Sequence, residues 1–179
     1  MSCVIWITGL PGSGKSTVAE ALKTALKDDA VILRMDDLRK VVTPVPTYSD
    51  EERELLYRSL VYTAKKLHES GNTVIIDATA HLRRWRTLAR NVICEYMEVY
   101  LKCSLDECRR REERRADSHQ APKSIYKKAE EGWPVPGVNV PYEEPTRPEI
   151  TIDTERTEIQ VAVNLILESA KNLFGSINV

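Results

Sequence analysis

The chain has 179 residues, with 26 Lys and Arg against 27 Asp and Glu and a formal net charge of −1. This length suits a single domain, 1–179, and the 42% apolar and 30% charged content excludes disordered and fibrous proteins. The balanced charge argues against a protein built mainly to coat nucleic acid, although it leaves room for a local basic groove. Four cysteines without a CxxC pair, and no signal-peptide pattern or long apolar run, predict a reduced, cytoplasmic protein with no membrane partner.

β-Rich runs alternate with amphipathic helices along the chain. The predicted strands are Cys3–Thr8, Ala30–Arg34, Thr73–Asp77, Tyr96–Lys102 and Glu149–Asp153. Predicted helices begin near Lys15, at Ser49, near Arg83, at Leu105 and after the last strand. Ser49 and Glu52 form a capping box for the second of these helices, which Gly71 can close. Strands separated by helices predict an α/β fold with a five-stranded parallel sheet flanked by helices on both faces.

Residues 116–148 interrupt this alternation. They hold most of the nine prolines, many charges and little apolar periodicity. An irregular stretch of that length inside a domain is typically a lid or a binding segment, and the alternative is a solvated excursion. Together with the arginine-rich residues before it, the stretch predicts a lid or substrate segment over about 109–148.

A glycine-rich sequence matches GxxxxGK[ST] after the first predicted strand and opens the first predicted helix. Its candidate contacts to ATP are Gly9, Leu10, Pro11, Gly12, Ser13, Gly14, Lys15, Ser16 and Thr17. The glycines let backbone N–H groups wrap a phosphate chain at a helix N-terminus. Lys15 can reach the β- and γ-phosphates, and the Ser16 hydroxyl can bind Mg²⁺. This phosphate loop predicts nucleoside triphosphate binding, and the lack of DxxG and NKxD motifs excludes a small GTPase.

Acidic and basic residues follow the second and third strands, at the edge where ligands bind in such folds. Asp36 can take the proton of an attacking hydroxyl, and Arg39 can bind an acceptor's anionic group. Asp37 is a candidate for capping or for binding Mg²⁺ through water, as Asp77 is for contacting metal-bound water. The alternatives are a metal-ligand role for Asp36, or a capping aspartate with a surface arginine.

Two arginine-rich stretches add positive charge. Arg109–Arg115 contain five arginines, of which Arg111 is the candidate for neutralising charge on the transferring phosphoryl group. Arg83, Arg86 and Arg90 form the second stretch. They could contribute to the site or could form a solvated helix face, and the sequence does not decide between these two interpretations. His81 is equally open between a structural and a functional role.

More specific signals lie in the last third of the chain. Tyr126–Ala129 read YKKA, and Gly137–Pro145 read GVNVPYEEP. These stretches resemble the adenylyl-sulfate kinase family, as do Tyr48–Ser49 with Arg53 and the strand Pro148–Thr154. The resemblance covers almost the whole chain. It implies a P-loop NTPase fold, with ATP and Mg²⁺ as cofactors. It also implies transfer of a phosphoryl group to the 3′-hydroxyl of adenylyl sulfate in sulfate assimilation, and a homodimer, which is an ordinary state for this family.

The resemblance also assigns residues. It makes Asp36 the base and implies that Arg39, Arg53 and Lys127 hold adenylyl sulfate. Two departures fall in the implied acceptor pocket: Leu56 replaces an asparagine that contacts the acceptor, and Val135 replaces a phenylalanine that stacks on its adenine. Loss of a stacking ring costs about 1–3 kcal/mol. We hypothesise that the nearby Trp133 replaces it.

A second resemblance leaves the acceptor open. Met35–Arg39 and Val74–Thr79 also resemble the RDDxR and DxTN segments of the 5′-hydroxyl polynucleotide kinase group, which adds Thr79 as a candidate acceptor contact. The same aspartate and arginine positions serve both groups, so that only the acceptor differs. Two alternatives remain. The chain could be a kinase for another small molecule with a hydroxyl group, or a regulatory ATP-binding module without phosphotransfer.

Overall fold

The computed structural model describes residues 2–27, 30–114 and 125–175. Its elements in chain order are β1 (Val4–Thr8), α1 (Lys15–Ala25), β2 (Ala30–Arg34), α2 (Met35–Val42), α3 (Asp50–Glu69), β3 (Thr73–Asp77), α4 (Arg83–Val92), β4 (Tyr96–Lys102), α5 (Leu105–Arg114), α6 (Ile125–Glu130), β5 (Ile150–Asp153) and α7 (Ile159–Phe174). Within these ranges, no helix is long and apolar enough to cross a membrane.

The five strands form one parallel sheet in the order β2-β3-β1-β4-β5. Strand β1 is central: its Ile5 is in register with Ile75 on one side and Met97 on the other. Every residue of β1 and β3 is buried, which explains why both read as continuous apolar runs. The five-stranded α/β sheet predicted from the sequence is therefore confirmed.

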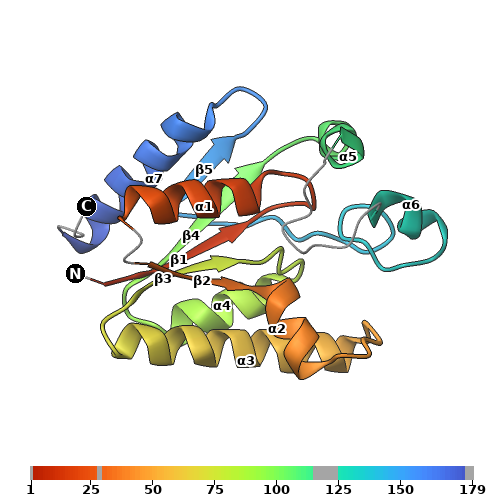
Figure 1. Cartoon of the computed structure of the whole chain (residues 1–179), viewed down its shortest axis with the longest axis horizontal. Helices are drawn as coiled ribbons and strands as arrows, with labels where there is room; N and C mark the ends of the chain where they lie inside the picture. Colours follow the sequence, from red (N-terminus) through yellow and green to blue (C-terminus); the bar gives the residue numbers. More distant parts are fainter. Residues whose placement is uncertain (1, 28–29, 115–124, 176–179) are drawn as a thin grey trace.

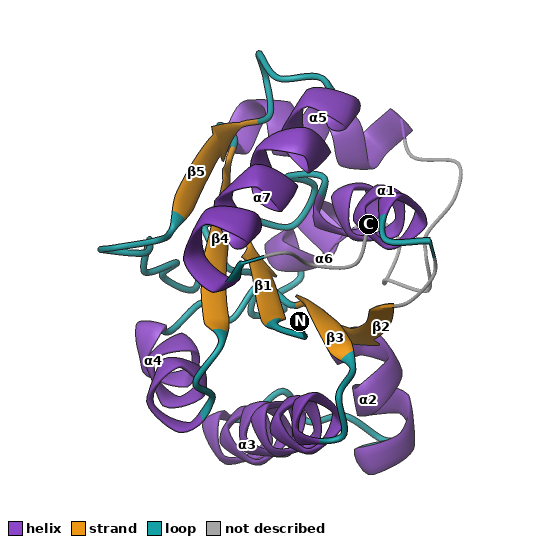
Figure 2. Ribbon diagram, turned by 90° about the vertical axis from the view of Figure 1, so that its left-hand side faces the viewer, coloured by secondary structure: helices purple, strands orange, loops and turns teal. Residues whose placement is uncertain are grey.

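Helices cover both faces of the sheet (Figures 1 and 2). Successive side chains of β1 point to opposite faces: Ile5 and Ile7 pack with α1 and α7, whereas Val4 and Trp6 pack with α3 and α4. A third, smaller cluster joins α5, α6 and the phosphate loop; it contains Cys103, Cys108, Tyr126, Ala129 and Val135, with Leu10 packed against it. The phosphate loop therefore lies between the sheet and the segment that the sequence predicts to be a lid.

Local signals explain the ends of α3. The Ser49 hydroxyl accepts the N–H of Glu52 at 3.2 Å, as the capping box predicts, and Gly71 follows the helix with a φ of 90°. Helix α6 differs from the prediction, because it lies inside the proline-rich stretch. Its Tyr126 and Ala129, three residues apart, give it one buried side that is too short to show as periodicity. Part of the predicted lid segment, 115–124, lies outside the described residues.

Two arginines of α4, Arg86 and Arg90, tie the helix to the rest of the fold, whereas Arg83 and Arg84 are exposed on its surface. Arg86 is only 1% exposed; its Nε lies 2.6 Å from the Glu98 carboxylate, and its other nitrogens donate to the carbonyls of Ala80 and Glu143. Arg90 pairs with Glu149 just before β5. These contacts tie α4 to β4 and to the chain that leads into β5. None of the three arginines discussed for this helix lines the cavity described below.

Candidate active site

The phosphate loop connects the central strand β1 to α1. Gly12 has a φ of 82°, and a Cβ there would lie 2.5 Å from the carbonyl oxygen of Cys108, so this position requires glycine. Gly14 is the N-cap of α1 and has no side chain with which to cap it. No side chain of the N-cap therefore covers the first turn of α1, where the sequence predicts that backbone N–H groups bind an anion.

The loop borders a cavity of about 480 Å³, which is large enough for a nucleotide-sized ligand. Pro11, Gly12, Gly14, Lys15, Ser16 and Thr17 line it. The ammonium group of Lys15 donates to the carbonyls of Gly9 and Leu10 at 3.1 and 2.9 Å. Gly9, Leu10 and Ser13 support the loop from outside the cavity wall: Gly9 and Ser13 are buried, and the Leu10 side chain packs against Gly137. Six of the nine predicted ATP contacts thus lie on the cavity.

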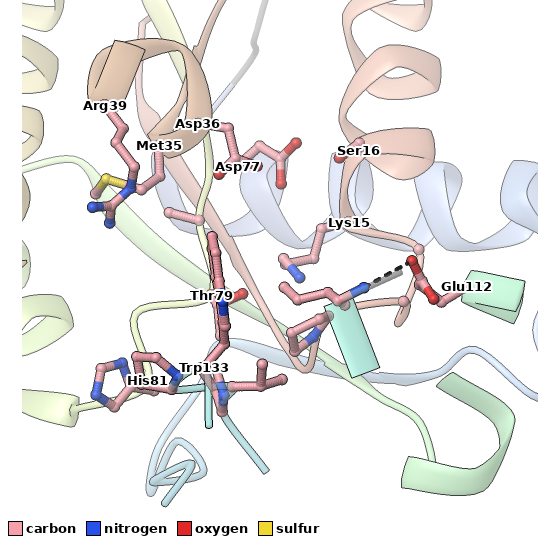
Figure 3. Close-up of a pocket in the computed structure, with 18 of the residues that line it drawn as sticks. Lys15, Ser16, Met35, Asp36, Arg39, Asp77, Thr79, His81, Glu112 and Trp133 are labelled. Carbon is pink, nitrogen blue, oxygen red and sulfur yellow. Dashed lines mark hydrogen bonds between the residues drawn. The ribbon is translucent and has the colours of Figure 1, made fainter. Parts of the chain in front are cut away.

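Two carboxylates face this loop. Asp36, at the start of α2, and Asp77, at the end of β3, lie side by side opposite Lys15 and Ser16 (Figure 3). Burial, followed by the neighbouring Asp77 carboxylate, raises the pKa of Asp36 above its usual range. Asp77 is 7% exposed, and the Nε of Arg34 lies 3.7 Å from its carboxylate.

Asp37 is placed differently from its neighbour. Its side chain is 41% exposed and 3.7 Å from the ammonium group of Lys40, and it does not line the cavity. The structure therefore brings two of the three predicted metal contacts, Ser16 and Asp77, to the cavity and leaves Asp37 outside it. A hydroxyl and a carboxylate are oxygen donors, which suit Mg²⁺.

An aromatic pair and an arginine form another part of the wall. Arg39 makes an ion pair with Glu52, and its guanidinium lies 4.7 Å from the centre of the Tyr48 ring. The Tyr48 ring is in turn 5.2 Å from that of Trp133, over which the Lys128 ammonium lies at 4.7 Å. Arg39, Tyr48 and Trp133 all line the cavity. Positive charge and two ring faces at one place suit a ligand with an anionic group and a flat base.

Arg53 and His81 lie together in the cavity wall. Arg53 is 6% exposed; its Nη1 is 3.3 Å from Nε2 of His81, and its Nη2 donates to the Pro134 carbonyl at 3.1 Å. Burial, followed by the Arg53 cation, lowers the pKa of His81 to about 4. The imidazole is therefore neutral at physiological pH.

The remaining predicted contacts divide into two groups. Thr79 and Arg111 line the cavity, and Arg111 is held by Glu107 and by Thr154, whose carbonyl accepts from its Nη2 at 2.7 Å. Lys127 is exposed on α6 and does not line the cavity.

The two departures from the family pattern also lie in different places. Leu56 is fully buried among α3 and α4 residues, away from the cavity lining, so it is a core residue here. Val135 does line the cavity, next to Trp133. Of the two departures, only Val135 therefore lies on the cavity.

Sequence reasoning missed several lining residues. Tyr57 lies four residues after Arg53 on α3, so helical spacing placed both on one face. Glu112 is adjacent to Arg111; it is buried, and its carboxylate accepts the N–H of Ile125 at 3.2 Å. Met35 carried no chemical signal of its own.

Comparisons with known proteins agree with this geometry. Residues 1–153 match the family model described as adenylylsulphate kinase. An adenylyl-sulfate kinase of Pseudomonas aeruginosa is 39% identical over 171 residues, which cover 92% of this chain and 83% of the relative. A probable adenylyl-sulfate kinase of Halalkalibacterium halodurans is 35% identical over 176 residues, covering 92% and 81%.

A solved structure extends the likeness to three dimensions. The APS kinase CysC of Mycobacterium tuberculosis, in complex with AMPPNP and APS, superposes with a TM-score of 0.82 at 28% identity, covering 95% of this chain and 98% of that one. The sequence matches one family over most of its length. The same chain contains the phosphate loop, the two carboxylates that face it and the five-stranded parallel sheet. The chain belongs to the adenylylsulphate kinase family.

Proposed function

We propose that this chain transfers the γ-phosphoryl group of ATP to the 3′-hydroxyl of adenylyl sulfate, giving ADP and 3′-phosphoadenylyl sulfate. The observation that carries the proposal is that Asp36 faces Lys15 and Ser16 across one cavity whose wall also contains Arg39 and Arg53. A base, a phosphate-binding loop and two cations in one cavity are the parts that phosphoryl transfer to an anionic alcohol requires. Family membership supports the choice of adenylyl sulfate as that alcohol.

In the proposed reaction, the oxygen of the 3′-hydroxyl attacks the γ-phosphorus of ATP, and Asp36 accepts the proton of that hydroxyl. The bond between the γ-phosphorus and the oxygen that bridges it to the β-phosphate breaks, which releases ADP. Lys15 and the N–H groups at the start of α1 bind the phosphates. Arg111 stabilises the charge that develops on the transferring group. Ser16 and Asp77 are the residues that would hold Mg²⁺, which would neutralise negative charge on the phosphates when bound.

Arg39 and Arg53 would hold the acceptor's anionic groups, and Thr79 is a further contact near Asp77. The role of Lys127 rests on the resemblance alone and that of Asp37 on its place after the second strand, since neither side chain lines the cavity. Closure of a lid over about 109–148, a homodimer and a cytoplasmic location stay predictions from the sequence.

The proposal is tested by measuring ADP release from Mg²⁺-ATP with adenylyl sulfate, with a 5′-hydroxyl oligonucleotide and without an acceptor. Turnover that depends on adenylyl sulfate, and forms 3′-phosphoadenylyl sulfate, supports it. Transfer to the oligonucleotide alone would instead assign the chain to 5′-hydroxyl polynucleotide kinase chemistry. ATP binding without acceptor-dependent turnover would identify a regulatory module.

Replacing Trp133 with Ala tests the proposed adenine contact. Because base–aromatic stacking contributes about 1–3 kcal/mol, we expect the KM for adenylyl sulfate to rise by about 5- to 150-fold while the KM for ATP changes little. Trp133→Phe keeps a ring face and is expected to stay close to the unsubstituted enzyme. An unchanged KM for adenylyl sulfate in Trp133→Ala would show that the base binds elsewhere.

A further inference from the structure

His81 is a buried side chain in the cavity wall to which the proposed reaction gives no role. It is 4% exposed and lies toward the same end of the cavity as Trp133, away from Asp36 and Ser16 (Figure 3). Its ring packs edge-on against Trp85 at 5.0 Å between centroids. Packing alone would not require an imidazole here, so its polar contact needs an explanation.

That contact defines the tautomer of the ring. A guanidinium carries five N–H donors and no acceptor, so the 3.3 Å approach of Arg53 Nη1 to His81 Nε2 requires Nε2 to be the acceptor. The proton of the neutral ring therefore sits on Nδ1. A neutral ring is also the form favoured by its surroundings, where burial and the Arg53 cation oppose protonation more than Asp50 and Glu143 favour it.

The loop that carries His81 is fixed from several sides. The N–H of Ala80 donates to the Tyr57 hydroxyl at 2.9 Å, and the Ala80 carbonyl accepts from the buried Arg86. The His81 carbonyl accepts the N–H of Glu143 at 2.8 Å. An acceptor held by three other segments of the chain can fix the direction of a long side chain such as that of Arg53, whereas a loose loop could not.

The other contact of Arg53 is fixed as well. Its Nη2 donates to the carbonyl of Pro134, and the residues on either side of Pro134 are bound by one amide: Asn139 donates to the Trp133 carbonyl at 2.7 Å and accepts the N–H of Val135 at 2.7 Å. The Arg53 guanidinium is thus held between two rigid acceptors. These two hydrogen bonds use two of its five N–H donors, which leaves further donors for an anion.

We propose that His81 is a positioning residue, whose neutral imidazole accepts a hydrogen bond from Arg53 and fixes the guanidinium that binds the anionic part of the acceptor. This assignment rests on the proposed function for the identity of the acceptor, but not for the contact between the two side chains. It explains why a histidine, and not an apolar residue, occupies this position. Its effect should appear in acceptor binding and not in ATP binding.

The kinetic test compares His81→Leu, which keeps the volume without an acceptor, with His81→Gln, which keeps an acceptor. We expect His81→Leu to raise the KM for adenylyl sulfate by about tenfold or more, with little change in the KM for ATP, since the variant removes a hydrogen bond to a charged group. His81→Gln is expected to restore most of the loss. The control is His68→Leu, since His68 pairs with Glu95 and does not line the cavity.

Thermal melting of each variant separates misfolding from lost positioning. Equal KM values for adenylyl sulfate in a folded His81→Leu variant and in the unsubstituted enzyme would overturn the proposal, as would equal losses in the Leu and Gln variants. If the unsubstituted enzyme does not turn over adenylyl sulfate, the proposed function fails and a second measurement decides the inference.

That measurement is the ¹⁵N NMR spectrum of the histidine rings, which needs no substrate. We expect His81 to carry its proton on Nδ1, and we expect the pKa of its ring to rise when Arg53 is replaced by Met, because the neighbouring cation is removed. A proton on Nε2, or a His81 titration that is unaffected by Arg53→Met, would overturn the contact itself.

Discussion

Replacing Asp36 with Asn is expected to lower kcat with adenylyl sulfate by about 10²- to 10⁴-fold while the KM for ATP stays nearly unchanged. The amide keeps the shape of the side chain but cannot take the proton of the attacking hydroxyl. Steady-state kinetics with each substrate varied in turn measures both effects. The matched control is Asp106→Asn, because Asp106 is exposed on α5 and does not line the cavity.

The pH dependence of activity is a second test of the role of Asp36 as the base. A base acts in its deprotonated form, and the pKa of Asp36 is raised by burial and by Asp77, so activity is expected to fall with decreasing pH sooner than it would with an exposed aspartate. The Asp36→Asn variant should lose this acid limb. A large loss of ATP affinity in that variant would instead identify Asp36 as a metal ligand.

Replacing Lys15 with Ala is expected to reduce turnover by at least about 10²- to 10³-fold, because the variant lacks the cation that faces the phosphate groups. The KM for ATP should rise as well, since the ammonium group also binds the phosphates of the ground state, although more weakly than it binds the transition state. A nucleotide-binding measurement alongside the kinetics separates the two effects.

Lys23→Ala supplies the control for this change, because Lys23 lies in the last turn of the same helix and does not line the cavity. Full activity in the Lys15→Ala variant would show that the phosphate chain does not bind at this loop. Loss of activity in both variants would indicate damage to α1 and not to the site.

Much of the fold could be predicted because its signals are local. Strands such as Thr73–Asp77 are short apolar runs between breakers, and the capping box at Ser49 sets the start of α3. Helix α6 could not be predicted from periodicity, since it has six residues and its burial depends on α5 and the phosphate loop. Its buried residues become a pattern only after these distant segments meet.

The site divides in the same way. The phosphate loop and Asp36 follow strand ends, where topology alone places them at one edge of the sheet. The aromatic pair of Tyr48 and Trp133 joins residues 85 positions apart, so no spacing in the sequence could reveal it. Arg86 appeared as one of several charges at helical spacing, and only its buried partner Glu98 on β4 distinguishes it from a surface arginine.

The packing of α7 beside α1 has a consequence for synthesis of the protein. Val163 and Ile166 of α7 complete the cluster that contains Val18 and Leu22 of α1, and β1 acquires its neighbours only when β3 and β4 exist. The phosphate loop therefore leaves the ribosome early but gains its supporting contacts late. A nascent chain that ends before Ile159 leaves exposed to water the part of the apolar side of α1 that packs on α7, so we expect it to stay incompletely folded until α7 has been made.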